Sequence, residues 1–306
     1  MTTPALRGAK GGTLLDQSAS ICKLSDDAPG SPPRQDNHRP AVPPEAPPPA
    51  YGWRLTDDLI MGLRFFSRLP TGDSPFEKPV LNRIAVGLSF TSVAIGFLPA
   101  LLMMLTAWIG IPSYFAATLG VAAMLVATGA MADDAIADSA DGLFGGMTVE
   151  RRLEIMKDSR HGTYGVAAIG LYLLFRVAAI GAVAAYNPLA AGAIWLASTV
   201  IGRSASLWLS VELPNAREGG ASASVGRVSR RAFFGGMGFA VLLAFVLAAP
   251  FTSAVAVILS LAAAAGVAAA WVWTCRKLIG GQTGDLIGAL QALIEVAVLT
   301  VLLVFV

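Results

Sequence analysis

Charged residues, cysteine and histidine are all scarce in this sequence, and each shortage excludes a class of protein. Charged side chains make up 14% of the 306 residues and hydrophobic ones 55%, whereas soluble globular domains average roughly 25% charged residues. The two cysteines, Cys22 and Cys275, lie far apart in segments of different character, so they indicate neither a disulfide nor a metal motif. The two histidines do not provide the His/Cys spacing of a zinc site. The sequence therefore excludes a soluble domain of this size and favours a membrane protein.

The first fifty residues differ in composition from the rest of the chain. Residues 1–50 contain ten of the eighteen prolines, and such a segment cannot bury a hydrophobic core. The N-terminal string MTTPALRGAKGG also lacks the apolar stretch of a signal peptide. We therefore predict a disordered Pro-rich tail over 1–50 and a membrane-embedded catalytic domain over 51–306.

The apolar segments after the tail have the length of membrane-spanning helices, which need roughly 20 residues each. They predict an all-α, polytopic integral membrane bundle of about seven transmembrane helices. Segment 53–69 carries three arginines and predicts a helix along the membrane surface, ended by Pro70. The predicted spans are 84–109, 113–131, 163–186, 189–211, 232–250, 252–274 and 286–306.

The basic residues predict the orientation of the bundle. Apart from Arg176 and Arg203, every Lys and Arg lies in the N-terminal region or in the loops 132–162, 212–231 and 275–285. These regions alternate so that they fall on one side, which the positive-inside rule identifies as the cytoplasm. We expect a multi-pass protein of the bacterial inner membrane with its active site on the cytoplasmic face. Arg176, Arg203 and Glu295 lie inside spans and should face the bundle interior; an Arg203–Glu295 ion pair and a substrate pocket both remain open.

Three acidic residues form a stripe at the centre of the sequence. Asp134, Asp138 and Asp141 are spaced i, i+4, i+7, which places their carboxylates within roughly 60° of one another on a helix. Like charges at such spacing repel unless a cation lies among them, so the stripe predicts a divalent metal site. The alternative is a solvated helix end with scattered acids, which has no reason to align them.

The turn that follows the stripe carries groups suited to phosphate. Asp158, Arg160 and His161 precede Gly162 and Gly165, and the glycines let backbone approach a ligand closely. An acid, two potential cations and a flexible turn suit a phosphate held through a metal. A polar turn entering the next span is the alternative, and His161 alone carries little weight.

Two further loops on the same side are rich in glycine. Arg217 precedes Gly219 and Gly220, and Gly284 precedes Asp285 at the start of the last span. The first loop suits an anion, although Gly/Ser-rich loops are also common linkers; Asp285 is either a helix cap or a site residue. Acids, arginines and glycines on one face best serve phosphoryl transfer, with Mg²⁺ on the carboxylates bridging a diphosphate.

The strings ADSADGLFGG, RRLEIMKDSRHGTYG and GGQTGDLIGALQALIE, at 137–146, 151–165 and 280–295, resemble the cobalamin synthase family of adenosylcobinamide-GDP ribazoletransferases. FFSRLPT at 65–71, Arg203 with Ser204, and AREGG at 216–220 fit the same family. The resemblance runs from about residue 60 to the C-terminus and leaves out the Pro-rich tail.

This resemblance implies a reaction and its partners. A ribose hydroxyl of α-ribazole, or of its 5′-phosphate, would attack adenosylcobinamide-GDP and release GMP, with Mg²⁺ as cofactor. We expect two small-molecule substrates, a lipid environment and no nucleic acid, and the oligomeric state stays open, a homo-oligomer included. We assign Asp134, Asp138 and Asp141 to the metal and, with Asp158, to catalysis. The expected substrate-binding residues are Arg160, Arg203, Arg217, Gln282, Asp285 and Glu295.

The chain departs from the family at the start of the acidic motif. Where the family pattern is His-x-Asp-Gly, this chain reads Ala132-Asp133-Asp134-Ala135. We still expect activity, because metal coordination can acidify a ribose hydroxyl without that histidine.

Two other functions have to be weighed. A phosphotransferase of the CDP-alcohol type needs Asp-Gly-x-x-Ala-Arg, which Ala135 and Ser139-Ala140 do not supply. A cation transporter should place its acids near the bilayer midplane, often at broken helices within inverted repeats. The sequence shows no internal repeat, and we expect the acids at the membrane edge.

Overall fold

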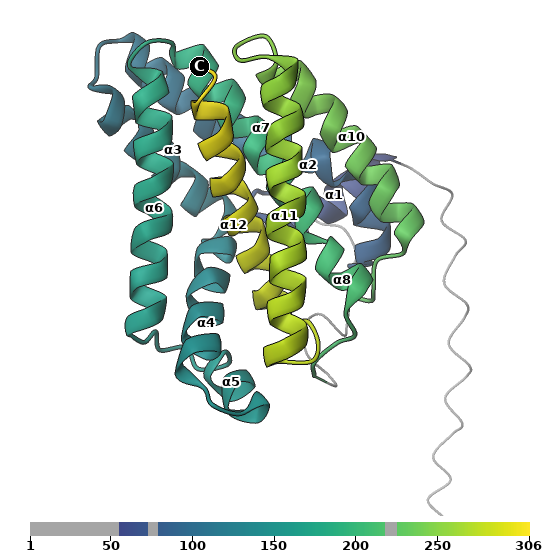
Figure 1. Ribbon diagram of the computed structural model, residues 1–306. Helices are drawn as coiled ribbons and strands as arrows, with labels where there is room; N and C mark the ends of the chain where they lie inside the picture. Colours follow the sequence, from purple (N-terminus) through teal and green to yellow (C-terminus); the bar gives the residue numbers. More distant parts are fainter. Residues whose placement is uncertain (1–54, 73–78, 218–224) are drawn as a thin grey trace, which may run out of the picture. The chain divides into compact units, whose positions relative to one another are not determined.

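The computed structural model describes residues 55–72, 79–217 and 225–306, which form a bundle of helices (Figure 1). The predicted tail, the first two residues of segment 53–69, and Gly219 with Gly220 lie outside these ranges. The helices are α1 (Leu55–Phe66), α2 (Leu81–Trp108), α3 (Ser113–Thr128), α4 (Met131–Gly145), α5 (Val149–Ile155), α6 (Thr163–Ala184), α7 (Pro188–Ser206), α8 (Trp208–Glu212), α10 (Arg230–Ala248), α11 (Ala254–Leu278) and α12 (Gly284–Leu303).

The prediction of an all-α membrane bundle is confirmed. Within the described ranges, six helical segments are long and apolar enough to cross a membrane, and the bent pair α3 and α4 would make a seventh. The division at Pro250 is also confirmed, since α10 ends at Ala248 and α11 begins at Ala254. The six segments are α2, α6, α7 continued through α8, α10, α11 and α12.

The prediction of a continuous second span over 113–131 is wrong. Helix α3 ends at Thr128, and the chain turns by 85° into α4. Gly129 and Ala130 both adopt left-handed backbone angles, with φ of 63° and 56°, which ends one helix and starts the next. A side chain at 129 would meet Arg68, since a Cβ there would lie 2.6 Å from its Nε. The acidic stripe is therefore not a loop beyond the membrane edge but a helix packed between α6 and α12 (Figure 1).

Helix α4 begins about halfway along the bundle. Asp133, in its first turn, lies 3.6 Å from Arg176 of α6, which in turn contacts Glu295 of α12 at 3.1 Å. At 1.5 Å per residue, Arg176 lies roughly 20 Å and Glu295 roughly 17 Å from the starts of their helices. The α3–α4 break thus provides the broken helix seen in some transporters, whereas the stripe residues Asp134, Asp138 and Asp141 contact the turn between α5 and α6.

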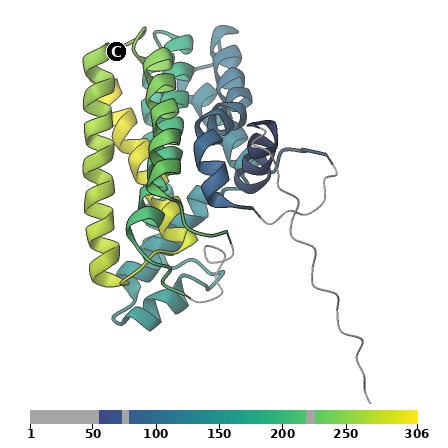
Figure 2. The ribbon, with the colours of Figure 1, turned by 90° about the vertical axis from the view of Figure 1, so that its right-hand side faces the viewer.

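Helix α7 forms the centre of the bundle and is buried from Ala190 to Ser206. Helices α2, α6, α10 and α12 pack against it, and the second view shows the green α10 between the light-green α11 and the blue α2 (Figure 2). Close approach depends on small residues: at Gly202, an added Cβ would lie 2.9 Å from the carbonyl oxygen of Gln291 on α12. Large apolar side chains such as Leu174 and Val246 remain exposed on the outer helices, as expected for lipid-facing surfaces.

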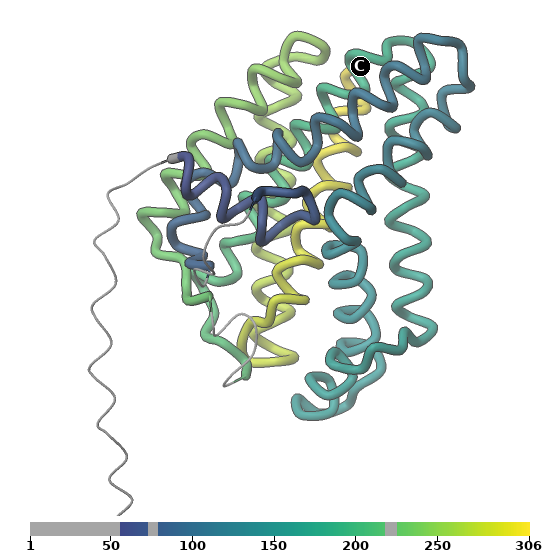
Figure 3. The backbone as a smooth tube through the Cα atoms, turned by 180° about the vertical axis from the view of Figure 1, so that it is seen from behind, coloured from purple at the N-terminus to yellow at the C-terminus, as the bar shows by residue number. Residues whose placement is uncertain are grey.

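Helix α1 lies across the longer helices and packs on α2 (Figure 3). Its Asp58 forms a 2.6 Å ion pair with Arg83, and Met61 and Phe66 are buried against the bundle. The segment after α1 reaches the α3–α4 break, where Arg68 N–H donates to the carbonyl of Ala127 at 2.7 Å. The membrane-surface position of this helix stays a prediction.

The connections gather at two ends of the bundle. The α2–α3, α6–α7 and α10–α11 connections lie at the end that holds the C-terminus, and α5 lies at the opposite end (Figure 1). At the α5 end, Arg152 donates to the carbonyl of Leu278 at 2.9 Å, so the loop after the acidic helix meets the loop before α12. The loops 132–162 and 275–285 therefore meet at one end of the bundle, and the side of the membrane on which they lie stays a prediction.

The contact between α10 and α2 provides a test of the packing. A Cβ at Gly236 would collide with the carbonyl oxygen of Ala85, whereas one at Gly235 would meet nothing within 4 Å. Gly236→Ala should cost roughly 1–3 kcal/mol through overpacking and lower the melting temperature of purified protein by roughly 3–8 °C. Gly235→Ala is the matched control and should melt at or above wild type, because alanine favours helix. Equal melting temperatures for the two variants would contradict this packing.

Candidate active site

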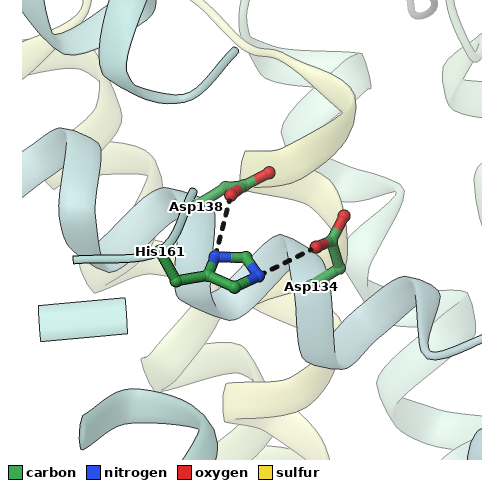
Figure 4. Close-up of side chains that lie close together, drawn as sticks. All are labelled: Asp134, Asp138 and His161. Carbon is green, nitrogen blue, oxygen red and sulfur yellow. Dashed lines mark ion pairs between the residues drawn. The ribbon is translucent and has the colours of Figure 1, made fainter. Parts of the chain in front are cut away.

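Three side chains converge at the exposed side of α4. Asp134 and Asp138 lie one turn apart on that helix, and His161 reaches them from the turn between α5 and α6 (Figure 4). The imidazole Nε2 lies 3.4 Å from Oδ1 of Asp134, and Nδ1 lies 3.5 Å from Oδ1 of Asp138. One ligand atom from each residue falls within 4.8 Å of the others. Two carboxylate oxygens and an imidazole nitrogen at such spacing fit a divalent cation.

Asp141 continues the same stripe but is engaged elsewhere. Its buried carboxylate accepts the backbone N–H groups of Gly162 at 2.6 Å and Gly165 at 2.9 Å. A Cβ at Gly165 would collide with this carboxylate, so the glycine is required for the contact. The structure thus groups two of the three predicted metal ligands with His161, and Asp141 holds the turn that presents His161. Its predicted role as a ligand stays a prediction.

Asp158 and Arg160 pair with each other at the edge of the site. The guanidinium donates from Nε and Nη2 to the two carboxylate oxygens at 3.0 and 2.8 Å. These hydrogen bonds lower the pKa of Asp158 to about 2, so the group is ionised at neutral pH. With Asp141, Arg151 and Glu154 they line a cavity of about 330 Å³, in which each arginine is paired with a carboxylate.

Arg217 and Gln282 tie the predicted loops together. Arg217 donates to the carbonyl of Leu153 at the end of α5. Gln282 forms a parallel bridge with Asn215: its N–H donates to Pro214 at 2.8 Å, and its carbonyl accepts from Ala216 at 2.9 Å. Its side-chain N–H also donates to Asn215, while its buried Oε1 has no hydrogen-bond partner among the described residues. The three loops therefore form one connected surface.

Asp285 belongs to the same acidic region. The interpretation of Asp285 as the cap of the last helix is wrong, because Thr283 caps α12 by accepting the N–H of Leu286 at 3.3 Å. Asp285 lies in the first turn, close enough for its charge to interact with Asp134, Asp138 and Arg217. A third carboxylate thus lies near the two of the cluster, and it comes from a second helix.

Glu295 is part of a buried polar network above the site. It contacts Arg176 at 3.1 Å, accepts from the Tyr172 hydroxyl at 2.9 Å and accepts from the Trp195 indole at 3.2 Å. The Arg203–Glu295 pair is not formed, because Arg176 takes that place and also approaches Asp133. These contacts favour a structural role for Glu295 over its predicted contact with substrate.

Arg203 is the other buried arginine of the interior. Its Nε and Nη1 have no hydrogen-bond partner among the described residues, and its guanidinium lies 5.7 Å from the centre of the Phe66 ring. An interior cation without an acidic neighbour in contact remains suited to an anionic ligand.

His161 is the site residue to which sequence reasoning gave too little weight. Its two partners lie 23 and 27 positions earlier in the chain, so spacing does not reveal the contact. The available signal was that His161 adjoins the glycine turn next to the acidic stripe. The structure changes it from a lone histidine into a member of the cluster.

Comparisons with known proteins agree on one family. The family model described as cobalamin-5-phosphate synthase matches residues 58–303. A protein of Azorhizobium caulinodans named adenosylcobinamide-GDP ribazoletransferase is 37% identical over 256 residues, covering 82% of this chain and 97% of that protein. A Xanthobacter autotrophicus protein of the same name is 38% identical over 258 residues, with the same coverage of each chain. No solved structure matches significantly.

The hold of Asp141 on the turn can be tested by limited proteolysis. Gly165→Ala should displace the carboxylate and loosen the turn, because hydrogen bonds to a charged group contribute about 1.5–3 kcal/mol each. Trypsin should then cut after Lys157 and Arg160 faster than in wild type. Gly170→Ala, on the same helix with nothing within 4 Å of an added Cβ, is the control and should be cut at the wild-type rate. Equal cleavage of both variants would refute the anchoring role.

Proposed function

The chain belongs to the cobalamin-5-phosphate synthase family, and from this premise we propose that it closes the nucleotide loop of cobalamin. In the proposed reaction, adenosylcobinamide-GDP and α-ribazole, or its 5′-phosphate, give adenosylcobalamin, or its 5′-phosphate, and GMP. The observation that carries the proposal is the cluster of Asp134, Asp138 and His161, with Asp285 and Arg217 beside it, on an apolar helical bundle.

The substrates explain why this site needs a cation. Both the diphosphate and the side chains of Asp134 and Asp138 are negatively charged, so they repel unless a positive charge lies between them. Asp134 and Asp138 would hold a divalent cation, which we propose to be Mg²⁺. When bound, it supplies charge neutralisation and Lewis-acid polarisation at the diphosphate.

Four side chains of the protein have separate roles in the proposed reaction. The ribose hydroxyl oxygen bonds to the phosphorus on the cobinamide side, and the bond from that phosphorus to the oxygen shared with the GMP phosphate breaks. Asp285, in the first turn of α12, would accept the hydroxyl proton. Arg160 and Arg217 would bind phosphate oxygens, for which the forked guanidinium is suited. Asp141 keeps the turn in place by holding the N–H groups of Gly162 and Gly165.

A transporter remains the alternative from another class, and one observation favours it. The break between α3 and α4 places an acidic half-helix inside the bundle, as in many transporters. Family membership over residues 58–303 outweighs this resemblance in architecture. Release of GMP by purified protein separates the two functions.

The decisive experiment is a GMP-release assay on purified protein with both forms of ribazole. Wild type should release GMP only when a divalent cation and both substrates are present. Asp138→Asn should reduce turnover at least about 100-fold, which corresponds to roughly 3 kcal/mol of lost transition-state stabilisation. Glu150→Gln, which changes an exposed acid on α5, should keep wild-type turnover. Wild-type turnover in Asp138→Asn with unchanged cation demand would refute the assignment.

We further propose that the protein lies in the bacterial inner membrane with the cluster on the cytoplasmic side. The basic loops at the α5 end support this orientation. Reporter fusions at Gly110, Asn187 and Pro250 should all report the periplasm, because these three connections lie at the opposite end. Fusions at Arg152 and Arg217 should report the cytoplasm. A cytoplasmic signal at Pro250 would overturn the proposed orientation.

A further inference from the structure

We infer that His161 supplies a nitrogen ligand to the cation site of Asp134 and Asp138, and that it biases this site toward Mn²⁺ and Co²⁺ relative to Mg²⁺. The inference rests on the proposed function for the presence of a cation. It adds a ligand from a second element and a metal selectivity.

The first argument is the position of the imidazole between two carboxylates. Both ring nitrogens face carboxylate oxygens, at 3.4 Å for Asp134 and 3.5 Å for Asp138 (Figure 4). Both distances exceed the usual N–H···O range of about 2.7–3.2 Å. A neutral imidazole has one N–H and one nitrogen with a lone pair. In the neutral ring, the lone pair of that nitrogen therefore points at the lone pairs of a carboxylate oxygen, and the two repel. A cation shared by that nitrogen and that oxygen converts the repulsion into coordination.

The second argument is that the two carboxylates differ in exposure. The side chain of Asp138 is 15% exposed and that of Asp134 is 63% exposed. Histidines that bind metals almost always donate their other N–H to a carboxylate, carbonyl or water, which fixes the ring. Oδ1 of Asp138 faces Nδ1 and, after a small approach, could accept its N–H in this way, which leaves Oδ2 as the atom with which Asp138 would bind the cation. The lone pair of Nε2 then faces the exposed oxygen of Asp134, where an incoming cation has access.

The third argument is that hydrogen bonds fix the turn that carries the imidazole. His161 directly precedes Gly162, whose N–H is held by the buried carboxylate of Asp141 at 2.6 Å. Gly165 adds a second hydrogen bond to the same carboxylate. The turn therefore brings the ring to the stripe before any cation binds, which reduces the entropic cost of ligation.

The selectivity follows from ligand chemistry. Mg²⁺ prefers an all-oxygen, octahedral environment and keeps several of its waters. Imidazole nitrogen increases affinity for first-row transition metals, in the order Mn²⁺, Fe²⁺, Co²⁺. A site with two carboxylates and one imidazole should therefore bind Mn²⁺ and Co²⁺ more tightly than the two carboxylates alone, with a smaller gain for Mg²⁺.

The test is pulsed electron paramagnetic resonance of Mn²⁺ bound to the full chain, purified with a histidine-free tag. Wild type should show coupling of Mn²⁺ to a ¹⁴N nucleus. The coupling should vanish in His161→Ala and His161→Asn and persist in His38→Ala, which removes the only other histidine. Affinity for Mn²⁺ should fall at least about 10-fold in the His161 variants, and affinity for Mg²⁺, measured by competition, should fall less.

Two results would overturn the inference. Absence of ¹⁴N coupling in wild type would exclude a nitrogen ligand, without depending on the folding of any variant. Unchanged or tighter Mn²⁺ binding in the His161 variants would identify the imidazole as a positive counter-ion that competes with the metal. GMP release is measured on the same samples: a wild type that turns over without ¹⁴N coupling refutes only this inference. A wild type that shows ¹⁴N coupling but releases no GMP refutes only the proposed function.

Discussion

Neutralisation of charge inside an apolar bundle is the constraint on which the site depends. Arg176 of α6 lies between Glu295 of α12 and Asp133 of α4, and so joins three helices through side chains that are all buried. Removing one member of such a buried group costs roughly 3–5 kcal/mol, because the partner is left as an uncompensated charge. Tyr172 donates to one carboxylate oxygen of Glu295 and Trp195 to the other, so the arrangement is specified by hydrogen bonds as well as by charge.

The same constraint separates the four aspartates of α4 into two pairs. Asp133 and Asp141 are buried and fix the helix near its two ends, the first through Arg176 and the second through backbone N–H groups at the start of α6. Asp134 and Asp138 lie between these anchors with more of their surface exposed. Because both ends of the helix are fixed, the two remaining carboxylates have a defined position without a partner of their own on α4. A rigid scaffold that holds unpaired like charges is what a cation site requires.

Hydropathy and loop charge were sufficient to predict the bundle, its approximate number of spans and the end at which the polar loops meet. They did not predict the break at Gly129 and Ala130, because the average hydropathy of a segment contains no information on backbone angles. In addition, alanine rarely adopts the left-handed conformation that Ala130 has. Helical spacing correctly placed Asp141 on the stripe but could not show that Gly162 and Gly165 would occupy it. Likewise the choice of Arg176 over Arg203 as partner of Glu295 depends on how α6, α7 and α12 rotate against one another.

Helix α12 is synthesised long after α4 and α6, with which it shares the buried charges. It carries Glu295, which completes the charge balance around Arg176 and Asp133, and Asp285 in its first turn. When α3, α4 and α6 first meet the translocon, Arg176 has only Asp133 within reach and α4 has one side uncovered. The acidic half-helix can reach its final packing only after α12 has been inserted beside it. A prematurely terminated chain therefore keeps most of the hydrophobic spans but exposes unbalanced charge within the bilayer, a feature by which membrane quality control can distinguish it from the finished protein.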